Sequence, residues 1–418
     1  MKIKSLQARE ILDSRANPTV EVKIILENGA EAKAAVPSGA STGENEALEL
    51  RDNNEERYGG KGVLTACQNI IEKIYPSIRD FSVFDQQKVD QKMLEIDGTK
   101  NKSTLGANAI LAVSLSVARA AANARMMPLW KYLQEKFEIE QREDVVLPAL
   151  MMNVINGGAH ADSGLDFQEY MIVVDGFDNF SERLRAGTEL YHALGKELKG
   201  RGFKTAVGDE GGFAPALNSN EEPLELMTKI INESSFVNQG DVQLGMDVAA
   251  SEFFDGENYK LTLEEETIPG VYLAKKYEQW LEKYKIRLIE DPFSEKDWES
   301  WKAFTNSHEN NLTLIGDDLL VTQKQFLTRA IEEKACNAIL IKVNQVGSLT
   351  ETMETIKLAK ESNFKIAVSH RSGETWDDFI ADLAIATQAE FVKFGAPART
   401  ERSTKYNRLA EIALDLGK

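Results

Sequence analysis

The feature of the sequence that most constrains its fold is a pattern repeated through the second half of the chain. A short apolar run, such as residues 312–316, ends abruptly at charged or ionisable residues. Such runs are typical of buried strands, and the charges then stand at the C-terminal end of each strand. The residues at these ends are Asp247, Glu290 and Asp291, Asp317 and Asp318, Lys342, His370 and Arg371, and Lys393.

The spacing of these ends predicts a parallel α/β barrel. From Glu290 onward, the intervals are close to the ~31 residues that one strand, one helix and two loops occupy in an eight-unit barrel. The longer interval before Glu290 contains a hairpin-like segment, residues 258–263. In such barrels the active site lies at the C-terminal strand ends. The alternative, charges that merely begin solvated loops, fits a single strand better than six in a row with acids and bases segregated.

Size and charge narrow the class of protein. The chain has 418 residues, 42% of them hydrophobic, which allows two or three domains or a large barrel with a smaller domain. A net charge of −18 argues against nucleic acid or an anionic membrane as the main ligand. An anionic substrate would need local cations or metal ions. We expect Cys67 and Cys336 to be reduced and buried. With no signal peptide and no long apolar span recognised, we expect a cytoplasmic enzyme without membrane insertion.

The first part of the chain predicts a separate α+β domain. Residues 3–36 indicate three strands with a hairpin turn at Asn28 and Gly29. The small residues of 37–43 predict either a flexible loop or a lid, in which Ser41 offers a hydroxyl to a metal or phosphate. Residues 62–131 look helical, with an almost apolar, buried helix at 105–124. A polar stretch then places the boundary near residue 140, giving domains 1–140 and 141–418.

The start of the second domain looks irregular. Residues 145–155 predict its first strand, and residues 166–174 predict another strand with acids at its start rather than its end. This reversal indicates a partly antiparallel beginning of the barrel. Residues 180–200 have helical periodicity.

Three of the strand ends, Asp247, Glu290 and Asp317, predict a metal site. Converging carboxylates repel one another unless a cation joins them. Oxygen ligands alone favour Mg²⁺, with Mn²⁺ also possible. The alternative is that each acid pairs with its own lysine or arginine. Lys342 and Lys393 are each either such a partner or a base with a lowered pKa, and the pattern does not decide between them.

Other polar loops are weaker signals. Arg371 and Ser372 could grip a phosphate or carboxylate, although this sequence is usually just a polar loop. Glu210 lies between glycines in residues 208–215, where an ordinary turn is the alternative to a catalytic acid. His160 could shuttle protons, but a lone histidine is more often structural.

Taken together, these motifs resemble the enolase family, the phosphopyruvate hydratases of glycolysis. The resemblance covers nearly the whole chain. Its motifs stand in family order: residues 8–19, 37–43, the surroundings of Glu210, 314–322, 342–345, 369–375 and Lys393. It implies a small N-terminal α+β domain followed by an eight-stranded α/β, TIM-like barrel with a ββαα start. The implied reaction is the Mg²⁺-dependent, reversible dehydration of 2-phosphoglycerate to phosphoenolpyruvate.

The resemblance also implies a role for each site residue. Asp247, Glu290 and Asp317 hold the first of two Mg²⁺ ions, and Ser41 with the substrate holds the second. Lys342, kept neutral by the surrounding positive charge, removes the C2 proton. Glu210, with Glu169 beside it, protonates the leaving hydroxyl. The implied substrate contacts are His160, Gln168, Glu169, Glu290, Asp317 and Lys393, with Arg371 and Ser372 on the phosphate. This assignment follows the chemistry of the superfamily, in which a Lys or His base works with Mg²⁺ ions that stabilise an ene-diolate.

Two competing functions remain at this stage. One is another lyase or racemase of the same superfamily, against which the motifs around Glu210 and Arg371 argue. The other is a secondary role as a surface receptor for host plasminogen, in which the final residue, Lys418, would enter a lysine-binding pocket. The resemblance further implies a homo-oligomer, either a dimer or an octamer, and for some members a cell-surface or secreted location.

Overall fold

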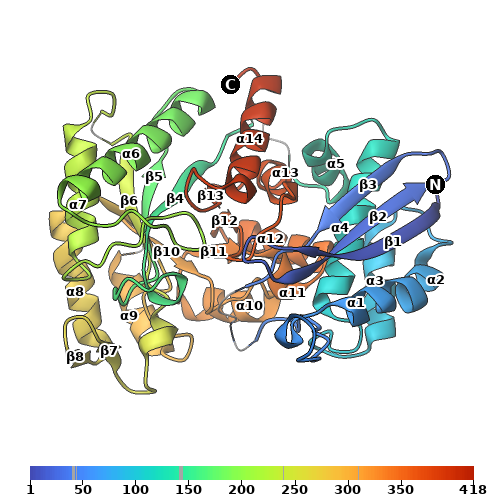
Figure 1. The fold of residues 1–418 in the computed structure, drawn as a ribbon, viewed down its shortest axis with the longest axis horizontal. Helices are drawn as coiled ribbons and strands as arrows, with labels where there is room; N and C mark the ends of the chain where they lie inside the picture. The colour runs from blue at the N-terminus through green and yellow to red at the C-terminus, as the bar shows by residue number, and fades with distance from the viewer. Residues whose placement is uncertain (40–42, 44, 141–144, 239, 309) are drawn as a thin grey trace.

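A computed structural model describes residues 1–39, 43, 45–140, 145–238, 240–308 and 310–418. Most of the predicted lid is thus covered, but Ser41 lies outside the described residues. Figure 1 shows a three-stranded sheet with its helices on one side of the molecule and a barrel on the other.

The predicted three-stranded meander is confirmed. β1 (Ile3–Leu12), β2 (Pro18–Leu26) and β3 (Glu31–Ala35) form an antiparallel sheet in that order. The turn between β2 and β3 contains Gly29 at φ +84°, a conformation that glycine adopts without strain. The helices that follow are η1 (Tyr58–Gly60), α1 (Leu64–Asn69), η2 (Ile70–Ile74), α2 (Tyr75–Ile78), α3 (Gln86–Asp97), α4 (Ala107–Ala124) and α5 (Leu129–Lys136).

Helix α4 is the core of this part of the molecule. It packs against β2 and β3, and 83% of its length is buried. By length and composition it could cross a membrane, so the expectation that the chain has no long apolar span was wrong. Its burial against the sheet accounts for its apolar sequence. Arg119 of α4 also donates to Asp377 of the barrel part at 2.9 Å, which ties the two parts together.

Eight strands among the described residues close into a barrel, as expected. Their order around it is β10-β11-β12-β13-β4-β5-β6-β9. The strands are β4 (Ala149–Asn156), β5 (Glu169–Val174), β6 (Val242–Asp247), β9 (Ile286–Glu290), β10 (Thr313–Gly316), β11 (Ala338–Ile341), β12 (Lys365–Ser369) and β13 (Phe391–Lys393). A separate apolar cluster fills the barrel interior, with Met151, Met171, Leu288, Leu340 and Phe391 among its members. The polar site therefore lies above a packed core rather than in an open pore.

The irregular beginning of the barrel is confirmed. β5 runs antiparallel to both β4 and β6, whereas the other neighbouring strands pair in parallel. Two helices, α6 (Phe180–Gly200) and α7 (Glu222–Glu233), separate β5 from β6. Because β5 is reversed, its first residue, Glu169, pairs with the last residue of β6, Asp247. Acids at the start of this strand therefore reach the same rim as acids at the ends of the others.

Helices surround the barrel in Figure 1. They are α8 (Gly270–Lys283), α9 (Trp298–His308), α10 (Lys324–Glu333), α11 (Val343–Val346), α12 (Leu349–Glu361), α13 (Phe379–Ala386) and α14 (Thr400–Asp415), with η3 (Gly158–His160) and η4 (Ala250–Phe253) in loops. The hairpin-like segment expected at 258–263 is part of a small sheet formed by β7 (Tyr259–Leu261) and β8 (Glu266–Ile268).

Candidate active site

Five charged residues reach the rim from the ends of parallel strands. Asp247, Glu290 and Lys393 are the last residues of β6, β9 and β13, and Asp317 and Lys342 directly follow β10 and β11. We call these five residues the lysine half of the site. Their contacts form two sets: Lys393 bonds Asp247 and Glu290, and Lys342 bonds Asp317.

Lys393 lies among three carboxylates. Its Nζ is 2.8 Å from Asp247 Oδ2, 2.8 Å from both oxygens of Glu290 and 3.2 Å from Glu169 Oε1. Burial opposes the charged form, but these acids outweigh it and raise the pKa of Lys393 well above its ordinary value. The ammonium form of Lys393 is therefore favoured, as expected of a partner of these acids.

Lys342 is paired with Asp317. Its Nζ bonds Asp317 Oδ2, and Gln345 Nε2 donates to Asp317 Oδ1 at 2.8 Å. Burial disfavours the ammonium, yet Asp317 outweighs burial and raises the pKa of Lys342. The neutral lysine expected from the resemblance is thus not the state of this structure.

Within the part of the chain that the structure describes, Asp317 is the acid of the lysine half whose carboxylate lies close enough to other acids for a shared cation, and those acids are Asp291 and Asp318. Burial, and next the nearby Asp247, raise the pKa of Glu290 well above its ordinary value, while Lys393 opposes the rise. Each expected ligand bonds a lysine, as the alternative interpretation of the three acids predicted. Asp247 and Glu290 bond Lys393, and Asp317 bonds Lys342. Carboxylate oxygens are the ligands that Mg²⁺ prefers, and a cation among them would release both lysines.

A second group of acids adjoins Asp317. Among the described residues, oxygens of Asp291, Asp317 and Asp318 lie within 4.8 Å of one another. Asp291 accepts the backbone N–H groups of Asp317 at 3.0 Å and Asp318 at 2.8 Å. Burial and the neighbouring Asp317 raise the pKa of Asp318 to about 8. Asp291 therefore braces the loop that carries Asp317.

Two histidine rings and an amide surround Glu210. Its carboxylate lies 3.6 Å from His160 Nδ1 and 3.3 Å from His370 Nε2, and it accepts a hydrogen bond from Asn153 at 3.1 Å. His160 Nδ1 is also 3.3 Å from Glu169 Oε1. All of these side chains are buried. We call His160, Glu169, Glu210 and His370, with the arginine behind them described below, the histidine half of the site.

Glu169 and Glu210 share one environment but hold protons differently. Burial, and next the charge of Glu210, raise the pKa of Glu169 to about 7. Burial alone would also raise the pKa of Glu210, but His160 and His370 outweigh it and hold that pKa well below its usual range. Two neighbouring carboxylates do not both ionise readily, so the protonated form is favoured at Glu169 and the ionised form at Glu210. The resemblance had given the donating role to Glu210, with Glu169 beside it.

The expected phosphate clamp is already occupied by a carboxylate. Arg371 donates to both oxygens of Glu46, at 2.9 and 3.2 Å, and to Asn344 Oδ1 at 3.0 Å. A planar guanidinium holding an anion through two bonds is the arrangement predicted for a phosphate or carboxylate ligand. Backbone bonds of 2.8 and 2.9 Å between Ser38 and Gly373 fasten the loop of Arg371 to the start of residues 37–43.

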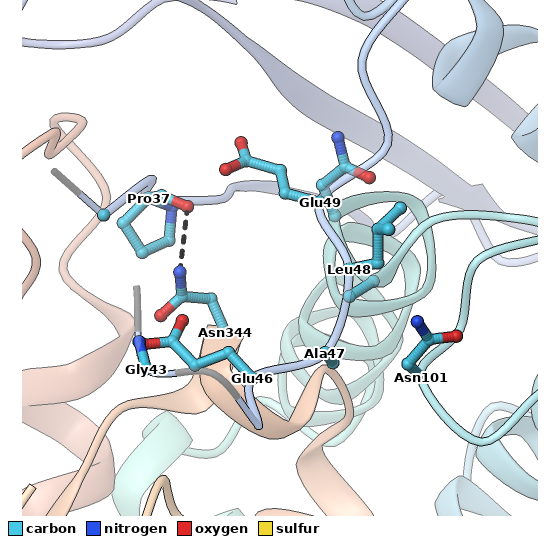
Figure 2. Close-up of a pocket in the computed structure, with 11 residues that line it drawn as sticks. Pro37, Gly43, Glu46, Ala47, Leu48, Glu49, Asn101 and Asn344 are labelled. Carbon is cyan, nitrogen blue, oxygen red and sulfur yellow. Dashed lines mark hydrogen bonds between the residues drawn. The ribbon is translucent and has the colours of Figure 1, made fainter. Parts of the chain in front are cut away.

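Figure 2 shows the surroundings of Glu46. Glu46 lines a pocket of about 410 Å³ between the segment that follows the predicted lid and the helices α4 and α11. Asn344 Nδ2 donates to Pro37 O across this pocket at 3.5 Å. The pocket lies next to the clamp, so movement of Glu46 into it would free Arg371.

Most of the predicted site residues line one cavity. Its lining consists of His160, Gln168, Glu169, Glu210, Lys342, Ser369, His370, Arg371, Ser372 and Lys393. Asp247 touches this group through Gln168, whose Nε2 donates to Asp247 Oδ2 at 3.3 Å, and through Lys393. Ser41 is the one predicted site residue that lies outside the described residues.

Sequence reasoning gave no role to His370, which lines this cavity, or to Glu46 and Arg402, which bond residues of its lining. His370 stands at a strand end, so the same rule that selected Lys393 could have selected it. Glu46 and Arg402 carry no such signal, because one follows the predicted lid and the other lies within α14, far along the chain. Only the folded chain brings them to the site.

Comparisons with known proteins agree with this geometry. Residues 3–133 match the family described as "Enolase, N-terminal domain", and residues 144–418 match "Enolase, C-terminal TIM barrel domain". A curated protein named Enolase from a Nitratiruptor species is 49% identical over 414 residues, which span 99% of this chain and 97% of that protein. These matches cover both parts of the fold and all residues of the site. The chain belongs to the enolase family.

Proposed function

We propose that the two halves of this site divide the two proton transfers of the enolase reaction between them. The chain is a phosphopyruvate hydratase, a lyase of glycolysis that interconverts 2-phosphoglycerate and phosphoenolpyruvate. The lysine half handles the proton on C2, and the histidine half handles the hydroxyl on C3. The observation that carries this proposal is that Lys342, Glu210 and Arg371 line one small cavity.

Enolases depend on a metal ion, and acids that could hold one are present here. We propose two Mg²⁺ ions, the first held by Asp247, Glu290 and Asp317 and the second by Ser41 together with the substrate. When bound, these ions supply positive charge that offsets the negative charge gathering on the substrate carboxylate. The pairing of Asp317 with Lys342 supports this assignment, because a cation that takes up Asp317 leaves Lys342 free to act as a base.

Lys342 takes the proton from C2 in the proposed reaction. The electrons of the C2–H bond form the C2=C3 double bond, and the C3–O bond breaks. Hydroxide is a poor leaving group, so the oxygen needs a proton as it departs. The pair of Glu210 and Glu169 supplies that proton, and the product is water. In the reverse reaction, the pair of Glu210 and Glu169 takes a proton from water as its oxygen bonds to C3, and Lys342 returns a proton to C2.

The remaining side chains bind and orient the substrate in this proposal. Lys393, a permanent ammonium, faces the substrate carboxylate together with Gln168 and His160. Arg371 and Ser372 hold the phosphate. The Glu46 carboxylate, held at 2.9 and 3.2 Å by Arg371, supports the last assignment because it shows the clamp accepting an anion.

The deciding experiment measures phosphoenolpyruvate formed from 2-phosphoglycerate by its absorbance. We expect EDTA to abolish turnover and Mg²⁺ to restore it, and Lys342→Ala to bind substrate but scarcely turn it over. The matched control is Lys365→Ala, because Lys365 begins β12 and bonds Thr313 at the opposite end of the barrel. Ample turnover by Lys342→Ala, or turnover of an acid sugar in place of 2-phosphoglycerate, would refute the proposal.

Other properties are proposed from the family resemblance. We propose a homo-oligomer, either a dimer or an octamer, that works in the cytoplasm; two buried free cysteines, Cys67 and Cys336, support a reducing compartment. A cell-surface or secreted population that binds plasminogen through Lys418 is a secondary proposal. Lys418 Nζ donates to Val145 O at 2.7 Å, so a lysine-binding partner has to break this bond. Unchanged plasminogen binding after deletion of residues 417–418 would end this idea.

A further inference from the structure

Arg402 is a fully buried arginine behind the histidine half of the site. It comes from α14, and its guanidinium reaches four acceptors that belong to two different loops. It contacts His370 Nδ1 at 2.7 Å and donates to the carbonyl oxygens of Arg371 at 2.5 Å, Ser372 at 2.5 Å and Asp209 at 3.0 Å. One side chain therefore joins the loop before Glu210 to the loop that holds the phosphate clamp.

The contact with Arg402 decides where His370 carries its proton. Arginine only donates hydrogen bonds, so His370 Nδ1 must accept and cannot itself be protonated. The neutral ring then carries its proton on Nε2, the atom that lies 3.3 Å from Glu210 Oε2. Burial together with Arg402 lowers the pKa of His370 to about 3, against the opposing effect of Glu210, so the ring stays neutral.

The backbone after Lys393 closes the same cluster. Gly395 has φ +80°, and a Cβ atom there would lie 2.8 Å from His370 Cε1, 2.8 Å from Glu210 O and 3.2 Å from Arg402 Cδ. Glycine is thus needed for both its backbone conformation and its close approach. The cluster has little room in which His370 could turn over and present its other nitrogen to Glu210.

We propose that Arg402 is a positioning residue for the acid step: it fixes His370 as the Nε2–H form facing Glu210 and holds the loops of Glu210 and Arg371 in register. Arg402 touches neither substrate nor metal ligands in this account and works only through its neighbours. The proposal rests on the proposed function, in which Glu210 serves the C3 hydroxyl and Lys342 serves C2.

The first test needs no variant and no activity. In ¹⁵N-labelled protein, NMR of the His370 ring should show a protonated Nε2 and an unprotonated Nδ1 from pH 6 to 8. A ring protonated on Nδ1 overturns the proposal, whatever the enzyme's substrate proves to be. Failure here is therefore distinct from failure of the proposed function, which the assay on 2-phosphoglycerate tests.

The second test is Arg402→Lys, which keeps the charge but loses the planar fork. We expect kcat for phosphoenolpyruvate formation to fall about 10–100-fold, the usual cost of losing an orienting partner. At saturating 2-phosphoglycerate, which offsets any weakening of the phosphate clamp, exchange of the C2 hydrogen with solvent should stay near the wild-type rate, because that step belongs to Lys342. The matched control is Arg408→Lys on the same helix, where Arg408 bonds Asp382 at 2.7 and 2.8 Å.

A double variant separates positioning from general damage. If Arg402 acts through Glu210, then Arg402→Lys should add no further loss in a Glu210→Gln background. Fully additive losses, or C2 exchange that falls as far as turnover does, would contradict the proposal. If Arg402→Lys does not fold, Gly395→Ala is the second variant, because its added methyl group would crowd the His370 ring and Arg402. The same selective loss of the dehydration step is expected of Gly395→Ala.

Discussion

The lysine half and the histidine half of the site differ in how they are built and in what they hold. The lysine half stands on the ends of parallel strands, and each of its acids bonds a lysine: Asp317 bonds Lys342, and Asp247 and Glu290 bond Lys393. The histidine half is assembled from loops, the reversed strand β5 and helix α14, and it keeps a proton between Glu169 and Glu210. This difference shows how one cavity can remove one proton from the substrate and donate another to it. In the proposed reaction, the acids of the lysine half suit a cation, and the two carboxylates of the histidine half suit proton transfer.

The largest effect expected is that of Glu210→Gln, which breaks the histidine half alone. The amide keeps the shape of the side chain but cannot pass on a proton, so kcat should fall by about 10²–10⁴-fold, the usual contribution of a general acid. Steady-state kinetics on 2-phosphoglycerate measure this fall. A loss of less than about tenfold would show that Glu169 can serve the leaving hydroxyl without Glu210.

Lys393→Met tests whether the lysine half depends on its ammonium groups for stability. Removing one partner from a buried charge cluster costs about 3–5 kcal/mol, so urea unfolding of the metal-free variant should shift by that amount. Saturating Mg²⁺ should recover part of the loss, because it neutralises the same acids. Lys365→Met is the control. Equal stability of metal-free Lys393→Met and wild type would contradict the charge balance described here.

The proton shared in the histidine half should be visible directly. Infrared difference spectra of the metal-free enzyme are expected to show a buried protonated carboxyl that titrates near pH 7 and is missing in Glu169→Gln. Because the folded-state pKa lies above the ordinary 4.5, the folded protein holds a proton that the unfolded chain has lost. The contribution of Glu169 to the free energy of unfolding therefore declines as pH rises from 4.5 to about 7. A carboxyl signal retained in Glu169→Gln would place the proton elsewhere.

Glu46→Gln should give the smallest effect and sharpens the account of substrate binding. The phosphate of the substrate has to displace the Glu46 carboxylate from Arg371, so a neutral amide should compete less well. We expect KM for 2-phosphoglycerate to fall by about tenfold, or ~1.4 kcal/mol, with little change in kcat. A higher KM would mean that Glu46 helps Arg371 to bind phosphate rather than competing with it.

The same contrast explains how much could be predicted from the sequence. Asp247, Glu290, Lys342 and Lys393 follow apolar runs, and parallel strands bring such ends together, so the barrel and the lysine half could be inferred. Glu169 reaches the rim of the barrel only because β5 runs antiparallel to its neighbours. The acids at the start of this strand indicated that reversal.

Arg402 could not be predicted, because nothing within a helix sequence marks a side chain that crosses to loops 31 and 193 residues away. The protonation states were also beyond the sequence. The ammonium of Lys342 follows from its distance to Asp317, and the proton on Glu169 follows from the ring nitrogens beside Glu210.

The measurement that tests the division of labour most directly is exchange of the C2 hydrogen of 2-phosphoglycerate with D₂O, followed by NMR in the presence of Mg²⁺. We predict exchange by wild type, exchange without dehydration by Glu210→Gln, and neither by Lys342→Ala. Exchange at the wild-type rate in Lys342→Ala, or its loss in Glu210→Gln, would contradict the account.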